Sequence, residues 1–162
     1  MPDAAGTRVT PRLRVLFLCT GHSCRSQMAE AWARHLKGNV IDASSAGTHP
    51  KGLDPLAVQV MAEVGIDLST HQVKSLDAVH HLPFDYVVTV CRDADETCPV
   101  FPGRARIVHC GFDDPPRLAA TAKSPEEALR HYVRVRDEIK AFIEQLPETL
   151  LSSREDPHEH YA

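Results

Sequence analysis

Apolar positions along the chain form short continuous runs that alternate with longer stretches of helical spacing. The runs at residues 13–18 and 84–90 are rich in aliphatic, β-branched and aromatic side chains and predict buried strands. Residues 40–45 and 105–109 predict two further strands. After the first run, residues 26–37 repeat apolar side chains at helical spacing, and Gly38 follows as a stop signal.

Two more helices are predicted from their start signals. Asp54 followed by Pro55 is typical of a helix cap with proline at the first helical position, and the apolar pattern continues to residue 64. Ser124 and Glu127 form a capping-box pattern that opens a helix over residues 124–146, which Pro147 would end.

Strands that alternate with helices indicate an α/β fold. We expect a single, doubly wound, mainly parallel four-stranded sheet with helices on both faces. The patterned region spans residues 13–147 and predicts one domain. Residues 1–12 and the polar tail 148–162 are expected to be disordered.

Composition narrows the class of protein. The 162 residues carry a net charge of −4 and no basic cluster, which argues against a nucleic-acid partner. No apolar run is long enough to span a membrane, and residues 1–12 lack a signal peptide's apolar stretch, so we expect a cytoplasmic protein. In a reducing compartment the five cysteines are expected to be buried, metal-bound or catalytic.

The segment after the first strand carries the strongest chemical signal. It reads Cys19-Thr20-Gly21-His22-Ser23-Cys24-Arg25-Ser26. A tight loop that enters a helix turns its backbone N–H groups inward, and this arrangement binds a tetrahedral oxyanion. The Arg25 guanidinium adds two donors for the anion, and the positive surroundings lower the pKa of the Cys19 thiol. Ser26 can donate a hydrogen bond to the resulting thiolate.

Read alone, Cys19 could be a buried thiol at the end of a strand and Arg25 a surface charge. The strand before the loop, the glycine within it, and the serine and helix after it favour the catalytic interpretation. Because parallel strands bring their carboxyl ends to one edge, Cys91 after the run 84–90 and Asp114 after the run 105–109 are expected beside Cys19.

The loop resembles that of the low-molecular-weight protein tyrosine phosphatase fold. The longer run from Cys19 to Glu30 resembles specifically the thioredoxin-coupled arsenate reductases built on that fold. The resemblance continues through most of the chain between Leu13 and Leu146. It includes Ser45-Ala46-Gly47, Val87-Val88-Thr89-Val90-Cys91, Asp93-Ala94-Asp95, Cys98-Pro99, Gly111-Phe112-Asp113-Asp114-Pro115 and Arg134-Val135-Arg136-Asp137-Glu138-Ile139.

The resemblance implies roles for residues at these positions. Asp114, which precedes a proline, would be the general acid that protonates the departing oxygen, and Asp113 is a weaker candidate. The run Asp-Asp-Pro-Pro is also typical of a turn, in which neither aspartate would need a catalytic role. Cys91 and Cys98 distinguish the reductase from the phosphatase, since they would carry the oxidation away from Cys19 as successive disulfides that thioredoxin reduces.

The segment between Cys91 and Cys98 bears on this relay. Residues 92–97 can form a short helix, in which positions seven apart lie ~10 Å from one another along the axis. A disulfide needs Cα atoms roughly 4.4–6.8 Å apart, so the segment would have to unwind. A zinc site is the competing interpretation for Cys91, Cys98, His109 and Cys110. However, Cys91 and Cys98 are separated by residues 92–97, which is longer than the usual spacing of paired zinc cysteines.

Departures from the family pattern concern the loop and a cation site. His22 stands where the family often has asparagine. Some members bind potassium through side chains that match Glu30 and Ser45, but Lys74 at a further matching position opposes a cation. We therefore expect no metal, with the Lys74 ammonium near Glu30 instead.

Together these features predict an arsenate reductase with no bound cofactor, in which thioredoxin is the external reductant. A glutaredoxin or a small thiol is the alternative reductant. A low-molecular-weight protein tyrosine phosphatase, which would share Cys19, Arg25 and Asp114, is the alternative function. A protein that binds a metalloid or metal through its cysteines without turnover is another.

Overall fold

The computed structural model describes residues 12–20, 24–48, 52–72, 74–91, 101 and 103–153. Its strands are β2 (Leu13–Cys19), β3 (Ile41–Gly47), β4 (Tyr86–Thr89) and β5 (Arg106–His109), and its helices are α1 (Arg25–Lys37), α2 (Pro55–Ala62), α3 (Leu76–Val79), α4 (Pro115–Ala120), α5 (Pro125–Glu144) and α6 (Glu148–Ser153).

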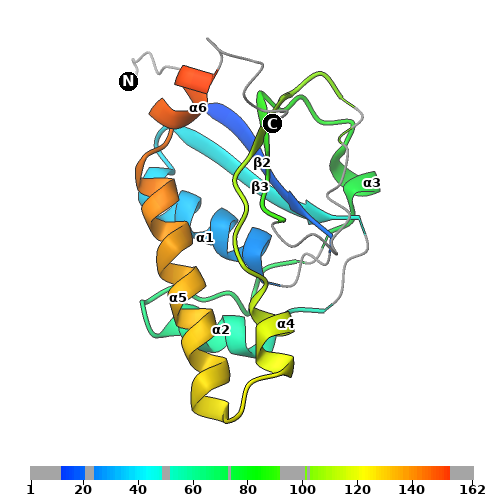
Figure 1. Ribbon diagram of the computed structural model, residues 1–162. Helices are drawn as coiled ribbons and strands as arrows, with labels where there is room; N and C mark the ends of the chain where they lie inside the picture. Colours follow the sequence, from blue (N-terminus) through cyan, green and yellow to red (C-terminus); the bar gives the residue numbers. More distant parts are fainter. Residues whose placement is uncertain are drawn as a thin grey trace.

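These strands form one parallel four-stranded sheet in the order β3-β2-β4-β5. Helices α1 and α5 run side by side along one face, and the short α3 lies on the other side (Figure 1). The α/β fold and the parallel sheet predicted from the sequence are confirmed. None of the helices in the described part of the chain is long and apolar enough to cross a bilayer.

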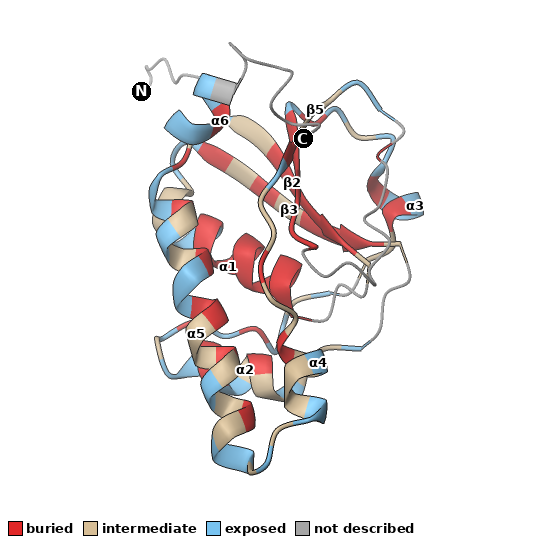
Figure 2. Cartoon of the chain, viewed as in Figure 1, coloured by how far each residue is buried: buried red, intermediate tan, exposed pale blue. Residues whose placement is uncertain are grey.

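The central strand β2 explains why its sequence is apolar at almost every position. Val15 and Phe17 pack into the core beneath α1 and α5, whereas Leu16 and Leu18 pack into a second, smaller core with α3. Successive side chains of a strand point to opposite faces, so a strand covered on both sides is apolar throughout. Figure 2 shows most of β2 and much of α1 as buried.

The predicted helix starts are present as hydrogen bonds. The Asp54 carboxylate accepts from Leu56 N at 3.0 Å, and Ser124 Oγ accepts from Glu127 N at 3.0 Å. Glu127 Oε1 in turn accepts from Lys123 N at 3.2 Å, one residue before the cap. Helix α1 ends at the predicted position, before Gly38.

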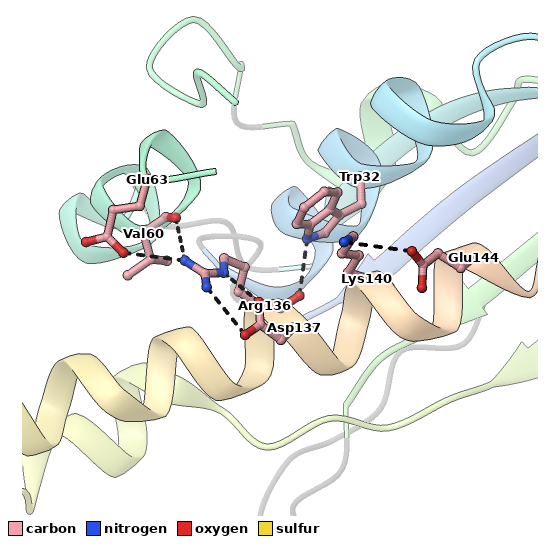
Figure 3. A network of polar contacts seen from close by, with 7 residues as sticks. All are labelled: Trp32, Val60, Glu63, Arg136, Asp137, Lys140 and Glu144. Carbon is pink, nitrogen blue, oxygen red and sulfur yellow. Dashed lines mark hydrogen bonds and ion pairs between the residues drawn. The ribbon is translucent and has the colours of Figure 1, made fainter. Parts of the chain in front are cut away.

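Three helices on the main core's side are linked by polar contacts. The Trp32 indole of α1 donates to the Arg136 carbonyl of α5 at 3.2 Å, and the Arg136 guanidinium donates to the Val60 carbonyl of α2 at 2.9 Å (Figure 3). These contacts join α1, α2 and α5 across their interface.

The C-terminal segment corrects one prediction. A disordered tail from residue 148 is wrong for residues 148–153, which form α6. Leu150 is fully buried in the main core, and this apolar contact stabilises a segment whose sequence is otherwise mostly polar. The predicted disorder of residues 1–11 and 154–162 lies outside the described residues.

Candidate active site

The carboxyl ends of the strands bring the expected residues to one edge of the sheet. Cys19 is the last residue of β2 and pairs in register with Gly47, while Leu18 pairs with Thr89. Cys91 follows Thr89 by two residues, and both Cys19 and Cys91 are buried. The sheet therefore places the first two cysteines of the expected relay at the same edge.

Helix α1 begins directly behind this edge. Ser26, in its first turn, lies with Oγ 3.1 Å from the Cys19 Sγ, and both side chains are buried. A hydroxyl at this distance can donate to a thiolate, and the amino-terminal end of a helix favours negative charge. Both features are suited to a cysteine that acts as a thiolate, as the sequence predicts for Cys19.

Arg25 connects α1 with the segments that follow β4 and β5. It is 4% exposed, and its Nη1 donates to the Phe112 carbonyl at 3.0 Å and to the Val90 carbonyl at 3.4 Å. Its Nη2 lies 3.7 Å from Asp114 Oδ2. Because two backbone carbonyls fix the guanidinium, its orientation toward Asp114 is defined by the fold.

Asp114 occupies the N-cap position of α4, and Pro115 and Pro116 form its first turn. The sequence of this stretch is compatible with a turn and does not predict the helix. The Asp114 side chain is 25% exposed, so it is accessible to a ligand from solvent. The neighbouring Asp113 turns instead to α5, where its Oδ2 lies 3.0 Å from Arg134 Nη1.

Cys24, within the expected oxyanion loop, lies in an environment that does not suit a nucleophilic thiol. It is buried at the N-cap of α1, and its carbonyl accepts from Met28 N at 2.9 Å. Burial raises the pKa of the Cys24 thiol well above its usual range, and the nearby Asp54 carboxylate raises it further. At neutral pH this thiol is protonated, which is unsuitable for a nucleophile.

Several predicted site residues lie outside the described residues. They are Gly21, His22 and Ser23 of the loop, and Cys98, together with the helix expected over residues 92–97. Thr20, at the start of the loop, is partly exposed. Among the residues that are described, no group of three or more His, Cys, Asp or Glu side chains is arranged to hold a metal ion.

The environment of Glu30 includes an arginine in addition to the Lys74 that the sequence suggests. Ser45 Oγ donates to Glu30 Oε1, and Arg34 Nη2 lies 2.6 Å from Glu30 Oε2. Arg34 is therefore a cation paired with this buried carboxylate. The spacing of four residues on one helix is a signal from which this pair could have been predicted.

Two further contacts near the site were missed from the sequence. The Tyr132 hydroxyl donates to Asp54 Oδ2 at 2.6 Å, and its burial together with this bond raises the pKa of the phenol. The ion pair between Asp113 and Arg134 was missed as well. Both contacts join residues of different elements, and no local spacing in the sequence indicates them.

Comparison with known proteins agrees with this geometry. A family model described as low molecular weight phosphotyrosine protein phosphatase matches residues 14–155. The arsenate reductase of Bacillus subtilis is 44% identical over 135 residues, which cover 83% of this chain and 95% of that protein.

Solved structures show the same likeness. A structure described as an arsenate reductase in the phosphate-binding state has a TM-score of 0.68 at 28% identity and covers 83% of this chain and 95% of its own. The thioredoxin-dependent arsenate reductase of Corynebacterium glutamicum has a TM-score of 0.60 at 26% identity and covers 89% of this chain and 64% of its own. The chain therefore belongs to the low molecular weight phosphotyrosine protein phosphatase family and, within it, to the arsenate reductases.

Proposed function

We propose that this protein reduces arsenate to arsenite through a thiol and disulfide relay that thioredoxin regenerates. The observation that carries the proposal is the convergence at one sheet edge of Cys19, Cys91 and the Arg25–Asp114 pair. Support for the substrate comes from relatives named arsenate reductase, and support for the reductant from the thioredoxin-dependent neighbour.

The first step is a substitution at arsenic. Arg25 and the backbone amides of residues 20–25 hold the arsenate oxygens. The Cys19 thiolate attacks arsenic, an arsenic–oxygen bond breaks, and Asp114 gives its proton to the departing oxygen, which leaves as water. The product is a Cys19 thiol–arsenic adduct, in which arsenic is still pentavalent.

The second stage reduces arsenic. The Cys91 thiolate attacks the Cys19 sulfur, and the electron pair of the sulfur–arsenic bond moves to arsenic, which leaves as arsenite. The Cys98 thiolate then attacks Cys91, so that Cys19 is released as a thiolate and a Cys91–Cys98 disulfide remains. Thioredoxin reduces this disulfide by thiol exchange. The cycle uses no bound metal or organic cofactor and requires a reducing compartment such as the cytoplasm.

Oxidation of NADPH in the presence of arsenate, thioredoxin and thioredoxin reductase tests the overall reaction. The relay is tested by Cys98→Ser, which should release about one arsenite per protein and then stop, as an enzyme does when its regeneration step is blocked. Non-reducing peptide mapping should find Cys19 joined to Cys91. Since this bond forms at a buried site, thioredoxin should reduce it slowly.

Cys110→Ser is the matched control, because it removes a thiol that the relay does not use. It should keep multiple turnovers with thioredoxin. Full multiple turnover in Cys98→Ser itself would contradict the three-cysteine relay.

Phosphate ester hydrolysis is the second candidate function, and the family match favours it. Cys19, Arg25 and Asp114 are sufficient for phosphoryl transfer to a cysteine and subsequent hydrolysis. An aryl phosphate substrate assayed beside arsenate separates the two functions, since a dedicated phosphatase would not consume NADPH with arsenate and thioredoxin.

A further inference from the structure

The segment between β5 and α4 is held from two sides. On the side of the active site, the Phe112 carbonyl accepts from Arg25, and Asp114 lies beside the same guanidinium. On the opposite side, Asp113 pairs with Arg134 of α5 at 3.0 Å. Two consecutive carboxylates therefore pair with two different arginines.

The backbone makes these two orientations dependent on each other. Asp114 has an extended conformation, with φ of −93° and ψ of 101°. Successive side chains of extended backbone point to opposite sides, so a contact that fixes Asp113 also determines the direction of Asp114. The Asp114 carboxylate makes no capping hydrogen bond with α4, and the helix start therefore does not orient it.

Arg134 is well placed to fix Asp113. It lies on α5, a helix of 20 residues whose inner face is buried in the main core. Its Nη1 also lies 3.2 Å from Glu138 Oε2, one turn further along the helix. The Arg134 and Asp113 side chains are 40% and 29% exposed, so their ion pair adds little to stability. The consequence of this pair for the site is the direction that it gives to Asp113.

We propose that Arg134 is a positioning residue for the acid step. By holding Asp113 against α5, it keeps the Asp114 carboxyl directed at Arg25 and at the bound anion, from where its proton passes to the oxygen that leaves arsenic or phosphorus. This inference rests on the acid role given to Asp114 in the proposed function.

Hydrolysis of two aryl phosphates tests the positioning role. Phenol is a much poorer leaving group than p-nitrophenol, so its release depends more strongly on a well-placed acid. Arg134→Gln should lower kcat/KM for phenyl phosphate roughly tenfold and for p-nitrophenyl phosphate less than about threefold. Asp113→Asn should reproduce this pattern, and Arg134→Lys, which keeps the charge, should largely restore activity.

Single-turnover release of arsenite applies the same test to arsenate. From pre-reduced protein, Arg134→Gln should slow this release roughly tenfold. Glu138→Gln is the matched control, because it removes another acidic partner of Arg134 without touching the segment before α4. It should change the release rate less than about twofold.

Asp114→Asn separates this inference from the proposed function. It should lower phenyl phosphate hydrolysis about a hundredfold, and adding Arg134→Gln to it should cause no further loss, because Arg134 acts through Asp114. Equal losses with both esters in Arg134→Gln, or additive losses in the double variant, would overturn the positioning role alone. If Asp114→Asn affected both esters equally, the acid role would fail, and the positioning role with it.

Discussion

Replacement of Arg136 by methionine should destabilise the protein by removing a cap from α2. Arg136 is 8% exposed, and its Nη1 donates to the Val60 carbonyl at 2.9 Å (Figure 3). Within α2 this carbonyl would be matched by Val64 N, but Val64 N donates to Met61 O at 3.1 Å. The guanidinium therefore satisfies a carbonyl from the last turn of the helix, where a cation is also favoured by the helix dipole.

The size of the effect follows from the burial of each partner. A hydrogen bond from a charged group to a carbonyl contributes about 1.5–3 kcal/mol. The carboxylates of Glu63 and Asp137, which also contact Arg136, are 47% and 57% exposed, so they stay solvated after the substitution and add about 0–1 kcal/mol. Methionine keeps most of the apolar stem. We expect a loss of about 2–3 kcal/mol, which corresponds to roughly 4–12 °C in Tm for a chain of this size.

Urea unfolding followed by circular dichroism measures this loss. Lys140→Met is the matched control, because Lys140 is a cation one turn further along α5. Its Nζ lies 5.5 Å from the centre of the Trp32 ring and 3.8 Å from Glu144 Oε2 (Figure 3). Because the Lys140 side chain is 43% exposed, these contacts should contribute less than about 1 kcal/mol. The reasoning is refuted if Arg136→Met lowers the free energy of unfolding no more than Lys140→Met does.

Other predictions concern the cysteines. Cys24→Ser and Cys110→Ser should each keep most arsenate turnover, and a large loss in either folded variant would contradict the relay. Weak hydrolysis of p-nitrophenyl phosphate should persist in Cys91→Ser, because Cys91 takes no part in phosphoryl transfer; its disappearance from folded protein would refute separate roles for Cys19 and Cys91. Because burial raises the pKa of the Cys24 thiol, iodoacetamide should leave Cys24 unmodified in native protein at pH 8 and label it in urea, as mass spectrometry can determine. The contribution of this protonated thiol to stability is complete below the usual thiol pKa and is lost as the pH rises above it.

Much of the secondary structure could be predicted because its signals are local. The apolar run of β2 and the caps at Asp54 and Ser124 each depend on neighbours within a few residues. Strand limits were less accurate, since β4 ends at Thr89 although the apolar pattern continues. Helix α6 was missed because the burial of Leu150 depends on the core against which it packs.

The features of the candidate site also fall into those that local sequence predicts and those that depend on tertiary packing. The sequence by itself determined that Cys19 and Cys91 follow the apolar runs of two strands and lie at one edge of a parallel sheet, because the carboxyl ends of parallel strands share an edge. Only the tertiary structure decided that Asp114 faces Arg25 while Asp113 faces Arg134, and that Arg136 caps α2. Spacing along a chain shows which residues share a face of one element. Contacts between side chains of different elements depend on how those elements pack, and the local sequence pattern does not determine that packing.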